Sequence, residues 1–489
     1  MKSYIGKRGY VLIKNKWDTE EIERVKEELM VKPFVNGDYG NNESPFPVYL
    51  ENSNKLYIPK YFGINKFGDA EKSNISLGED INLEFNGQLR DHQKEPIQKC
   101  LNAFENTGGG ILSLPCGDGK TACACYLISK LKKKTFVLVH KEFLMNQWIE
   151  RILGGNDSHS FLPGARVGRI QGQVIDIEDK DIVIGMIQSI SMKNYPLDLF
   201  DSFGFVILDE SHRVPSREFS KALMKINCKY MLGLSATPNR KDGLTQVLKW
   251  YIGDIIYQRK GKSTTDSSVE RYIYDCSAED YSKEISGYYG KINSAAMINN
   301  IAGFLLRTKF IVSKTVECIR EEERQVLILS DRKELLKDLE TFLKEEGIES
   351  GYYIGGMKQV CLEDSAKKSV ILATYQMAAE GLDISTIDTI ILATPKTEIE
   401  QAVGRIRPKV GQTNRNTPLV IDIVDDFSIF ARQAQKRDTF YKKKKYFIET
   451  FRITRNGELI NKVSTWDPEE EKITKTKNTG IKSFAFSKV

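Results

Sequence analysis

The sequence predicts an α/β protein in which two tandem lobes, each a parallel sheet with helices on both faces, follow a small N-terminal domain. From about residue 87 onward, short apolar runs alternate with helical patterns, as they do in βαβ units. The polar stretch RKGKSTTDSS at 259–268 interrupts this alternation and is typical of a linker between lobes. Two of the apolar runs end in glycine-rich or acidic residues, and open parallel sheets bind their ligands at the carboxyl ends of strands.

The expected domain boundaries follow from these shifts in composition. We expect an N-terminal accessory domain at 1–86, a first lobe at 87–265, a second lobe at 266–450 and a basic flexible tail at 451–489. A chain of 489 residues is longer than one hydrophobic core usually supports, and 40% hydrophobic residues suffice for several cores. The expected strands of the second lobe are the apolar runs at 326–330, 369–374, 389–394 and 419–426.

Composition excludes several classes of protein. The net charge of +6, from 72 basic and 66 acidic residues, is mild, so a polyanion must be bound through local patches. We expect no transmembrane helix, because no run of about eighteen apolar residues occurs, and no signal peptide, because the first residues lack an apolar core. The eight cysteines lack metal-ligand spacing, which indicates reduced thiols in a soluble intracellular protein. We expect Cys123 and Cys125 to fill a core.

The first chemical motif is a glycine-rich loop between an apolar run at 110–114 and a helical pattern that ends in lysines. Glycines let such a loop bend tightly and direct its N–H groups at an anion, and the helix N-terminus adds partial positive charge. Lys120 is expected to reach the β- and γ-phosphates of a nucleoside triphosphate, and Thr121 to bind Mg²⁺. A plain glycine turn is the alternative, since Leu114 stands where the general pattern has its first glycine. The expected nucleotide-binding residues of the loop are Pro115, Cys116, Gly117, Asp118, Gly119, Lys120 and Thr121.

The second motif is an acidic pair behind a buried strand. The apolar run 203–208 ends in Asp209 and Glu210, where the carboxyl end of a parallel strand would present them to a ligand. We expect Asp209 to hold Mg²⁺ through water, and Glu210 to orient and deprotonate the attacking water. The alternative is a solvated turn, which the apolar strand in front of the pair disfavours.

With these residues in place, the chain from about 90 to 450 resembles a superfamily 2 helicase. The resemblance rests on a series of motifs that occur in the expected order. A single one of these motifs would not establish it. Beside the two motifs already described, these are LRDHQ at 89–93, FVLVHKEFLMNQW at 136–148, IVIGMIQS at 182–189, LSATP at 234–238, QVLILSDR at 325–332, ATYQMAAEGLDI at 373–384 and EQAVGRIRPK at 400–409. The resemblance implies two RecA-like lobes that close on ATP.

The resemblance also implies roles for individual residues. Gln93 would contact adenine, and the motif at 373–384 would touch both the strand and the nucleotide. The implied coupling residues are His212, Ser235, Thr237 and Gln401, and the implied contacts of the second lobe with strand or nucleotide are Thr374, Gly381 and Asp383.

The arginine motif departs from the family pattern. Its second arginine normally follows three residues after the first, whereas here Arg407 follows Arg405 by two and Pro408 comes next. Proline changes the helix turn at this point. Arg405 is the expected phosphate contact. Arg407 is either the arginine finger, shifted by one residue, or the partner in a structural ion pair.

Within the superfamily, the chain is similar to the XPB/UvsW group, through LPCGDGKT, DESH and the RxxQ of 90–93. Where that group has an Arg-Glu-Asp element, this chain has Lys241 in the middle, which puts the role of that element in doubt. The stretches 56–68 and 437–446 resemble the helicases of large cytoplasmic DNA viruses, including the poxvirus-type transcript-release helicases.

The resemblance implies an ATP-dependent DNA helicase or translocase that uses Mg²⁺, contacts the strand backbone with little sequence specificity and has no membrane partner. A viral role would add the transcription machinery as a partner, with the host cytoplasm, in viral factories, and the virion as locations. The alternatives are an RNA helicase, a motor subunit of a larger complex, and a non-catalytic nucleic-acid-binding scaffold.

Two further segments combine aromatic and basic residues. YLENSNKLYIPKYFG at 49–63 suits DNA binding by phosphate contact and stacking, and a small accessory domain packed on the motor is an equal alternative. ARQAQKRDTFYKKKKY at 431–446 is a basic helix for which we favour phosphate contact. The alternative for this helix is a solvated face, with Phe440 and Tyr441 packed inward.

Overall fold

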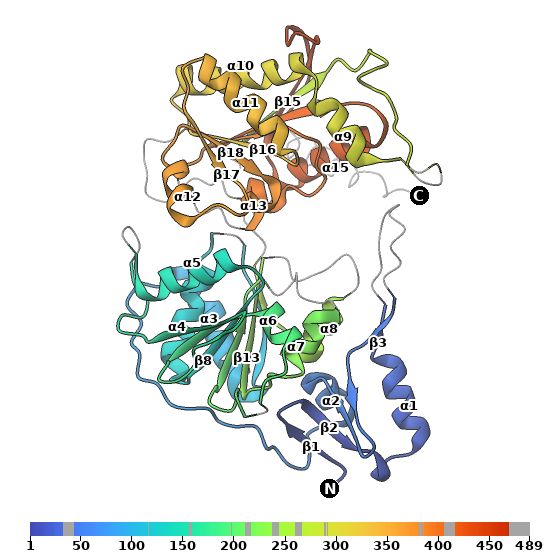
Figure 1. Ribbon diagram of the computed structural model, residues 1–489, viewed down its shortest axis with the longest axis vertical. Coiled ribbons are helices and arrows are strands. Elements are labelled where there is room, and N and C mark those ends of the chain that lie inside the picture. The colour runs from blue at the N-terminus through green and yellow to red at the C-terminus, as the bar shows by residue number, and fades with distance from the viewer. Residues whose placement is uncertain are drawn as a thin grey trace, which may run out of the picture. The chain divides into compact units, whose positions relative to one another are not determined.

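The structure, a computed structural model, consists of two compact units, Met1–Gly261 and Lys262–Val489. Each unit contains an eight-stranded sheet with helices on both faces, as drawn in Figure 1. The structure describes residues 1–32, 44–115, 117–155, 159–196, 198–210, 217–236, 244–259, 267–287, 290, 292–380, 384, 386–404 and 416–468.

The N-terminal part of the first unit is a small antiparallel sheet with two helices. The sheet has the order β1-β2-β6-β5, with β1 at Ser3–Gly6, β2 at Gly9–Ile13, β6 at Lys55–Ile58 and β5 at Leu50–Glu51. The helices are α1 (Thr19–Glu28) and α2 (Lys60–Phe67). Tyr10 and Leu12 face a core that continues into the first lobe, where Phe62 meets the Trp250 ring edge-on at 5.2 Å. The N-terminal part is therefore packed on the lobe that follows it.

The sheet of the first lobe has the strand order β10-β9-β11-β8-β12-β13-β7-β14, and all of its pairs except β10–β9 are parallel. Its strands are β7 (Gly109–Ser113), β8 (Thr135–Val139), β9 (Val167–Gln171), β10 (Val174–Ile175), β11 (Ile182–Met186), β12 (Phe205–Leu208), β13 (Tyr230–Ser235) and β14 (Ile255–Gln258). Its helices are α3 (Asp91–Asn106), α4 (Lys120–Leu131), α5 (Glu142–Leu153), α6 (Ile187–Met192), α7 (Arg217–Leu223) and α8 (Thr245–Ile252).

Alternate residues of the central strands enter two different cores. On β12, Phe205 and Ile207 pack in the core that holds α3, α4 and α5, while Val206 and Leu208 pack in the core that holds α6, α7 and α8. Because both faces are covered, every residue of β12 is buried, which explains the continuous apolar run in the sequence. Cys123 and Cys125 lie fully buried in the first of these cores.

The second unit repeats this architecture with the strand order β17-β18-β16-β19-β20-β15-β21-β22. Its strands are β15 (Ser268–Tyr274), β16 (Val326–Ser330), β17 (Ser350–Tyr353), β18 (Val370–Thr374), β19 (Thr389–Leu392), β20 (Leu419–Asp425), β21 (Phe447–Ile453) and β22 (Leu459–Trp466). Its helices are α9 (Ser294–Ala302), α10 (Leu305–Glu322), α11 (Lys333–Glu345), α12 (Gln359–Ala366), α13 (Tyr375–Glu380), α14 (Glu400–Val403) and α15 (Ser428–Lys444). α9, α10 and α11 pack on one face of the sheet, and α13, α14 and the end of α15 on the other.

Two predicted boundaries are wrong. Residues 451–466 are not a flexible tail, because β21 pairs in parallel with β15 and β22 pairs with β21, which extends the sheet by two strands. Ile448 and Ile453 are the buried apolar residues by which β21 could have been predicted. The basic residues directly before β21 made its apolar pattern difficult to recognise. At the other end, Ile81 and Leu83 already belong to the core of the first lobe, which therefore begins before residue 86.

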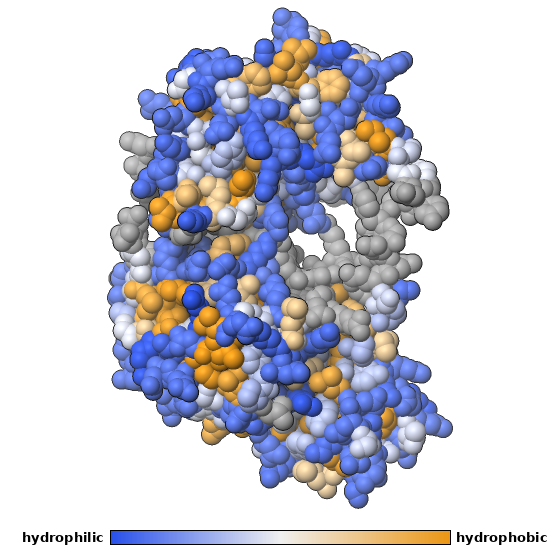
Figure 2. Space-filling view, in the orientation of Figure 1, coloured by the Kyte–Doolittle hydropathy of each residue, from blue (hydrophilic) through white to orange (hydrophobic). Residues whose placement is uncertain are grey.

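The face drawn in Figure 2 is mainly hydrophilic, as expected when most apolar residues lie in the cores. Hydrophobic residues form small groups on this face. Within the described ranges, each helix by itself is too short or too polar to span a bilayer. α9 and α10 reach the necessary length and hydrophobicity only when taken together, and the chain bends by 69° at the break between them.

Candidate functional site

The glycine-rich loop joins the end of β7 to the start of α4, at the carboxyl edge of the first lobe's sheet. Gly117 and Gly119 both have left-handed backbones, with φ of 79° and 78°. A Cβ atom on Gly119 would lie 2.4 Å from Gln93 Nε2, so no larger residue fits there without displacing that amide. Leu114, which replaces the usual first glycine, is fully buried, and its N–H donates to Ser235 O at 3.0 Å.

Gln93 lies behind this loop, at the start of α3. Its Nε2 donates to Asp118 O at 2.8 Å, and its Oε1 accepts from the Arg90 N–H at 2.9 Å. Only 2% of Gln93 is exposed. The side chain thus holds the loop against α3, and the adenine contact implied by the resemblance stays a prediction.

Two arginines that the sequence reasoning did not assign also contact the loop. Arg259 Nη1 forms an ion pair with Asp118 Oδ2 at 3.1 Å, and Arg90 Nη1 donates to Gly117 O at 3.4 Å. Arg259 lies in the polar stretch interpreted as a linker. Arg259 could have been assigned from its position directly after the strand β14. Because β14 pairs in parallel with β7, the ends of both strands lie at the same edge of the sheet.

Lys120, the predicted catalytic lysine, and the acidic pair meet in front of the loop. Lys120 Nζ donates to Leu114 O at 3.3 Å and lies 3.9 Å from Glu210 Oε1. Asp209 and Glu210 follow β12 directly, and Asp209 Oδ1 accepts from the Glu210 N–H at 2.9 Å. Glu210 has a φ of 50°, in the left-handed region that costs a non-glycine residue about 1–3 kcal/mol. The strained backbone of Glu210 thus occurs at the residue whose carboxylate faces Lys120.

Asp209 is held by a residue of the neighbouring helix. Trp148 Nε1, from α5, donates to Asp209 Oδ2 at 2.8 Å. Loss of water around the carboxylate and, second, the charge of Glu210 raise the pKa of Asp209 to about 6, against the opposing effects of the Trp148 bond and the Lys120 charge. A divalent cation would favour the ionised form.

The donor set suits magnesium. Thr121 lies in the first turn of α4, next to Lys120 and directly after the loop, and Asp209 supplies a carboxylate. Mg²⁺ prefers hydroxyl, carboxylate, phosphate and water oxygens and usually takes only one or two carboxylates from the protein. The oxygen ligands available here therefore fit Mg²⁺ bound together with a nucleotide.

The structure brings together those predicted site residues of the first lobe that it describes. Ser235 ends β13 and pairs in register with Ser113 at the end of β7, which places Ser235, the first residue of the Ser-Ala-Thr motif, beside the strand that leads into the loop. In the second unit, Thr374 ends β18 and Gln401 lies in α14. The predicted residues that lie outside the described ranges are Cys116, His212, Thr237, Gly381, Asp383, Arg405 and Arg407.

The basic helix predicted at 431–446 belongs to α15 as far as Lys444, and its aromatic residues face inward. Tyr441 is fully buried, and Phe440 packs against the same core. Arg437 is also buried, and its guanidinium pairs with Asp422. The inward packing agrees with the alternative interpretation for the aromatic residues, and leaves the lysines near the end of the helix for contacts at the surface.

A parallel sheet whose edge carries a glycine-rich loop, a lysine and a carboxylate pair defines a nucleotide-binding lobe of the phosphate-loop type. Two family models match the chain: "Type III restriction enzyme, res subunit" over residues 86–240 and "Helicase conserved C-terminal domain" over residues 309–408. The chain belongs to the superfamily 2 helicases, in the group found in large DNA viruses.

Two viral relatives support this membership. A protein of Acanthamoeba polyphaga mimivirus is 36% identical over 482 residues, which cover 96% of this chain and 90% of that protein. A protein of African swine fever virus is 29% identical over 412 residues, 78% of each chain. The names of both place them among ATP-dependent RNA helicases.

A solved structure shares the fold. The structure of S. cerevisiae Dbp5 bound to RNA and ADP BeF3 aligns with 78% of this chain and 93% of that chain, with 14% identity and a TM-score of 0.50. The two tandem RecA-like lobes predicted from the sequence are thereby confirmed. The family models and the mimivirus relative confirm the predicted helicase family. The chain is an ATP-hydrolysing helicase.

Proposed function

We propose that this helicase acts on DNA and couples ATP hydrolysis in the first lobe to movement along a strand and to unwinding. The observation that carries the proposal is the approach of Lys120 Nζ to Glu210 Oε1, 3.9 Å apart and next to Asp209. It joins a phosphate-binding cation to the carboxylates that metal-assisted hydrolysis needs. The preference for DNA rests on LPCGDGKT and DESH, which resemble the DNA translocases of the superfamily.

The residues of the site divide the work of hydrolysis among them. Lys120 exchanges its bond to Leu114 O for the phosphate oxygens of ATP, and the N–H groups of the glycine loop bind the same phosphates. Asp209 and Thr121 would hold Mg²⁺, which would supply positive charge against the phosphates. Glu210 orients the attacking water and accepts its proton. Arg405 or Arg407 of the second lobe would supply positive charge to the transition state.

The substrate is tested by the stimulation of ATP turnover. Wild-type protein is assayed alone and with single-stranded DNA, duplex DNA and RNA of equal length. Lys120→Ala and Glu210→Gln are expected to reduce turnover at least about 100-fold, as the loss of a positioned catalytic group does. Glu105→Gln, on the exposed surface of α3, is the control and should retain wild-type turnover.

Each outcome of this experiment has a consequence. Stronger stimulation by DNA supports the proposal, and stimulation by RNA alone would replace it with an RNA helicase, the second candidate that the names of the viral relatives favour. Turnover by Glu210→Gln at the wild-type rate would contradict the role of that carboxylate. Strand displacement on duplexes with 3′ or 5′ tails then determines the polarity.

The resemblance to poxvirus-type helicases extends the proposal to a role in viral transcription, in the release of transcripts within the host cytoplasm. The viral relatives support a viral setting. A transcription assay with a stalled polymerase of the same virus tests this role, because release must then depend on ATP and on Lys120.

We also propose that the N-terminal sheet contacts the nucleic acid through an aromatic platform, formed by Tyr4 and Tyr57 on either side of the buried Val11. These residues are direct neighbours across β1, β2 and β6 and lie on the face opposite to Tyr10 and Leu12. Both tyrosines are only half-buried. Tyr57 also packs against the core, so only the exposed part of each ring is open to stacking with bases.

Each platform tyrosine carries a cation. Lys55 Nζ lies 5.4 Å from the ring centroid of Tyr4, and the Arg8 guanidinium lies 5.4 Å from that of Tyr57. Stacking surfaces combined with cations suit a single strand, whose bases stack while its phosphates bind the charges. Charge complementarity therefore favours a single-stranded polyanion as the occupant of this face.

A further inference from the structure

We infer that Arg307, Tyr375 and Arg437 are positioning residues that fix the segment 393–396, and with it the helix α14 that leads into the arginine motif. The inference rests on the proposed function, because it assigns these residues to the placement of Arg405 or Arg407 in hydrolysis. None of the three has to touch the nucleotide.

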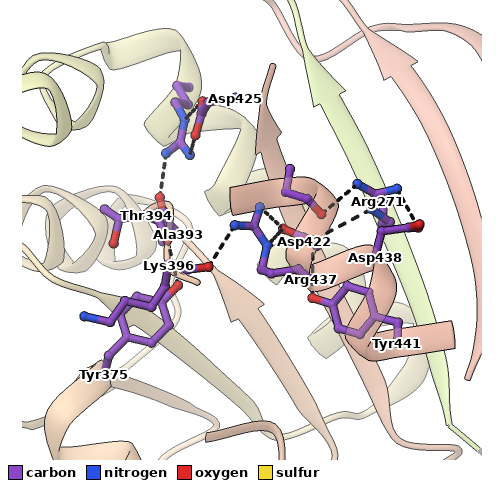
Figure 3. Close-up of polar contacts among 12 residues, drawn as sticks. Arg271, Tyr375, Ala393, Thr394, Lys396, Asp422, Asp425, Arg437, Asp438 and Tyr441 are labelled. Carbon is purple, nitrogen blue, oxygen red and sulfur yellow. Dashed lines mark hydrogen bonds and ion pairs between the residues drawn. The ribbon is translucent and has the colours of Figure 1, made fainter. Parts of the chain in front are cut away.

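Three side chains bind carbonyl groups of the same short segment. Figure 3 labels two of them, Tyr375 and Arg437, together with Ala393, Thr394 and Lys396 of the segment. Arg307 Nη1 donates to Ala393 O at 2.6 Å, and Tyr375 Oη donates to Thr394 O at 2.7 Å. Arg437 Nη1 donates to Lys396 O at 2.9 Å. The donors come from three different helices, α10, α13 and α15. The segment is thus held from several directions.

Both arginines are themselves locked by carboxylates of β20. Arg307 pairs with Asp425 through Nε at 3.0 Å and Nη2 at 2.9 Å. Arg437 pairs with Asp422 through Nε at 3.0 Å and Nη2 at 2.8 Å. The planar guanidinium binds a carboxylate with one edge and keeps its remaining N–H groups in a fixed direction.

The two ion pairs lie on opposite faces of the sheet. Asp422 shares the face of Val420 with α15, and Asp425 shares the face of Ile421 and Ile423 with α10. All seven residues of β20 are buried, so two carboxylates in this strand bear a large desolvation cost that apolar residues would avoid. In both pairs the arginine directs an N–H group at the segment 393–396. This role explains why β20 contains two aspartates, although aliphatic side chains would make the buried strand more stable.

The segment also connects other motifs of the second lobe. Lys396 Nζ forms an ion pair with Asp331 at 2.8 Å, and the Thr394 hydroxyl accepts from the Asp331 N–H at 2.9 Å. Asp331 belongs to the motif 325–332, and Tyr375 to the motif 373–384, to which the resemblance gives contacts with the strand. Both are expected strand-contacting elements, and both meet the segment that precedes α14.

α14 is held at its other side by α15. Glu400, the first residue of α14, forms an ion pair with Lys444 at 2.6 Å. The chain passes from the segment through α14, with Gln401, directly to the arginine motif. A displacement of the segment would therefore displace α14, the helix that directly precedes the arginine motif in the sequence.

The test compares two buried tyrosines. Tyr375→Phe removes the phenol bond to Thr394 O, and Tyr274→Phe removes a phenol bond of 2.8 Å to Arg455 O, elsewhere in the same unit. Each tyrosine is 3% exposed, so the substitutions are matched in burial, in chemistry and in the type of acceptor. Thermal unfolding measures the loss of stability, which is expected to be the same for both variants.

The readouts are kcat and KM for ATP at saturating nucleic acid, and hydrogen exchange of the amides of 397–404. Tyr375→Phe is expected to lower kcat about five- to tenfold, the equivalent of one hydrogen bond, with KM unchanged within about twofold. Exchange at 397–404 should become faster. Tyr274→Phe should change neither readout.

Equal kcat and equal exchange in the two variants would overturn the inference, and so would a change confined to KM. If the wild-type protein hydrolyses no ATP, the proposed function fails and the inference fails with it. If Tyr375→Phe does not fold, Thr394→Val removes the hydroxyl that accepts from Asp331 and must produce the same loss of kcat and the same faster exchange.

Discussion

Trp148 Nε1 donates a hydrogen bond of 2.8 Å to Asp209 Oδ2 and thereby orients the carboxylate expected to hold magnesium. The bond favours the ionised form of Asp209, because it is donated to a carboxylate oxygen, and so it opposes the effect of desolvation on the pKa. A buried indole on α5 thus influences both the direction and the charge of a group at the end of β12.

The first prediction concerns the pH dependence of ATP turnover. Because the pKa of Asp209 is raised to about 6, turnover should fall as the pH decreases through about 6, where the carboxylate becomes protonated and loses its affinity for Mg²⁺. Trp148→Phe removes the bond that favours the ionised form, so the acidic limb should move to higher pH. The position of the acidic limb is measured in rate–pH profiles at several Mg²⁺ concentrations, since Mg²⁺ should shift the limb to lower pH.

Trp250→Phe is the control for this experiment. An acidic limb that stays unchanged in Trp148→Phe would contradict the prediction.

The second prediction concerns the ion pair that holds the phosphate loop. Arg259 Nη1 and Asp118 Oδ2 lie 3.1 Å apart, with 21% and 14% of their side chains exposed. Arg259→Ala should raise KM for ATP several-fold, since a partly buried pair is worth about 1 kcal/mol, while kcat changes less. Steady-state kinetics of Arg259→Ala, Asp118→Ala and the double variant measure the coupling. Fully additive effects would show that the pair does not hold the loop.

The third prediction concerns a buried lysine between the N-terminal part and the first lobe. Lys60 is 7% exposed, and its Nζ donates to Lys229 O at 3.3 Å. Burial lowers the pKa of Lys60 to about 8 from 10.5, a difference that corresponds to about 3 kcal/mol. Below pH 8 the charged lysine destabilises the folded state. Between pH 8 and 10.5 the folded protein releases its proton before the unfolded chain does, so the free energy of unfolding rises with pH.

Denaturant unfolding of Lys60→Met at pH 7 to 10.5 checks this sign. The variant should be more stable than the wild type at pH 7, or at least as stable, and this difference should shrink as the pH rises to 10.5. Lys66→Met, on the exposed side of the same helix, serves as the control. A difference between wild type and Lys60→Met that does not change with pH would refute the assignment.

The fourth prediction concerns the aromatic platform of Tyr4 and Tyr57. Tyr57→Ala should weaken the binding of single strands by about 1–3 kcal/mol through lost stacking, and Arg8→Ala should reduce the salt dependence of binding by about one charge. Fluorescence anisotropy with labelled DNA and RNA of equal sequence, in a salt series, measures both effects. Lys16→Ala, an exposed lysine outside the platform, is the control. Unchanged affinity in Tyr57→Ala would leave the N-terminal sheet as a packing domain only.

Most of the nucleotide site was predictable because its chemistry is local in sequence. The glycines of 117–119, Lys120 and the pair Asp209–Glu210 are short motifs at the ends of apolar strands, and parallel strands bring their carboxyl ends to one edge. Arg259 and Trp148 were not assigned, because their roles depend on which strands and helices are neighbours. The pairing of β14 with β7 and the packing of α5 beside β12 are relationships between distant segments.

The sequence by itself determined the two lobes, the order of the motifs and the residues expected to meet a phosphate, because each depends on hydrophobic periodicity or on a few adjacent residues. Only the tertiary structure decided that residues 451–466 complete the second sheet, that Arg437 of a basic helix is buried, and that Arg307, Tyr375 and Arg437 converge on the segment 393–396. The physical reason is that a charged side chain enters a core only where a partner from a distant part of the chain compensates for its desolvation.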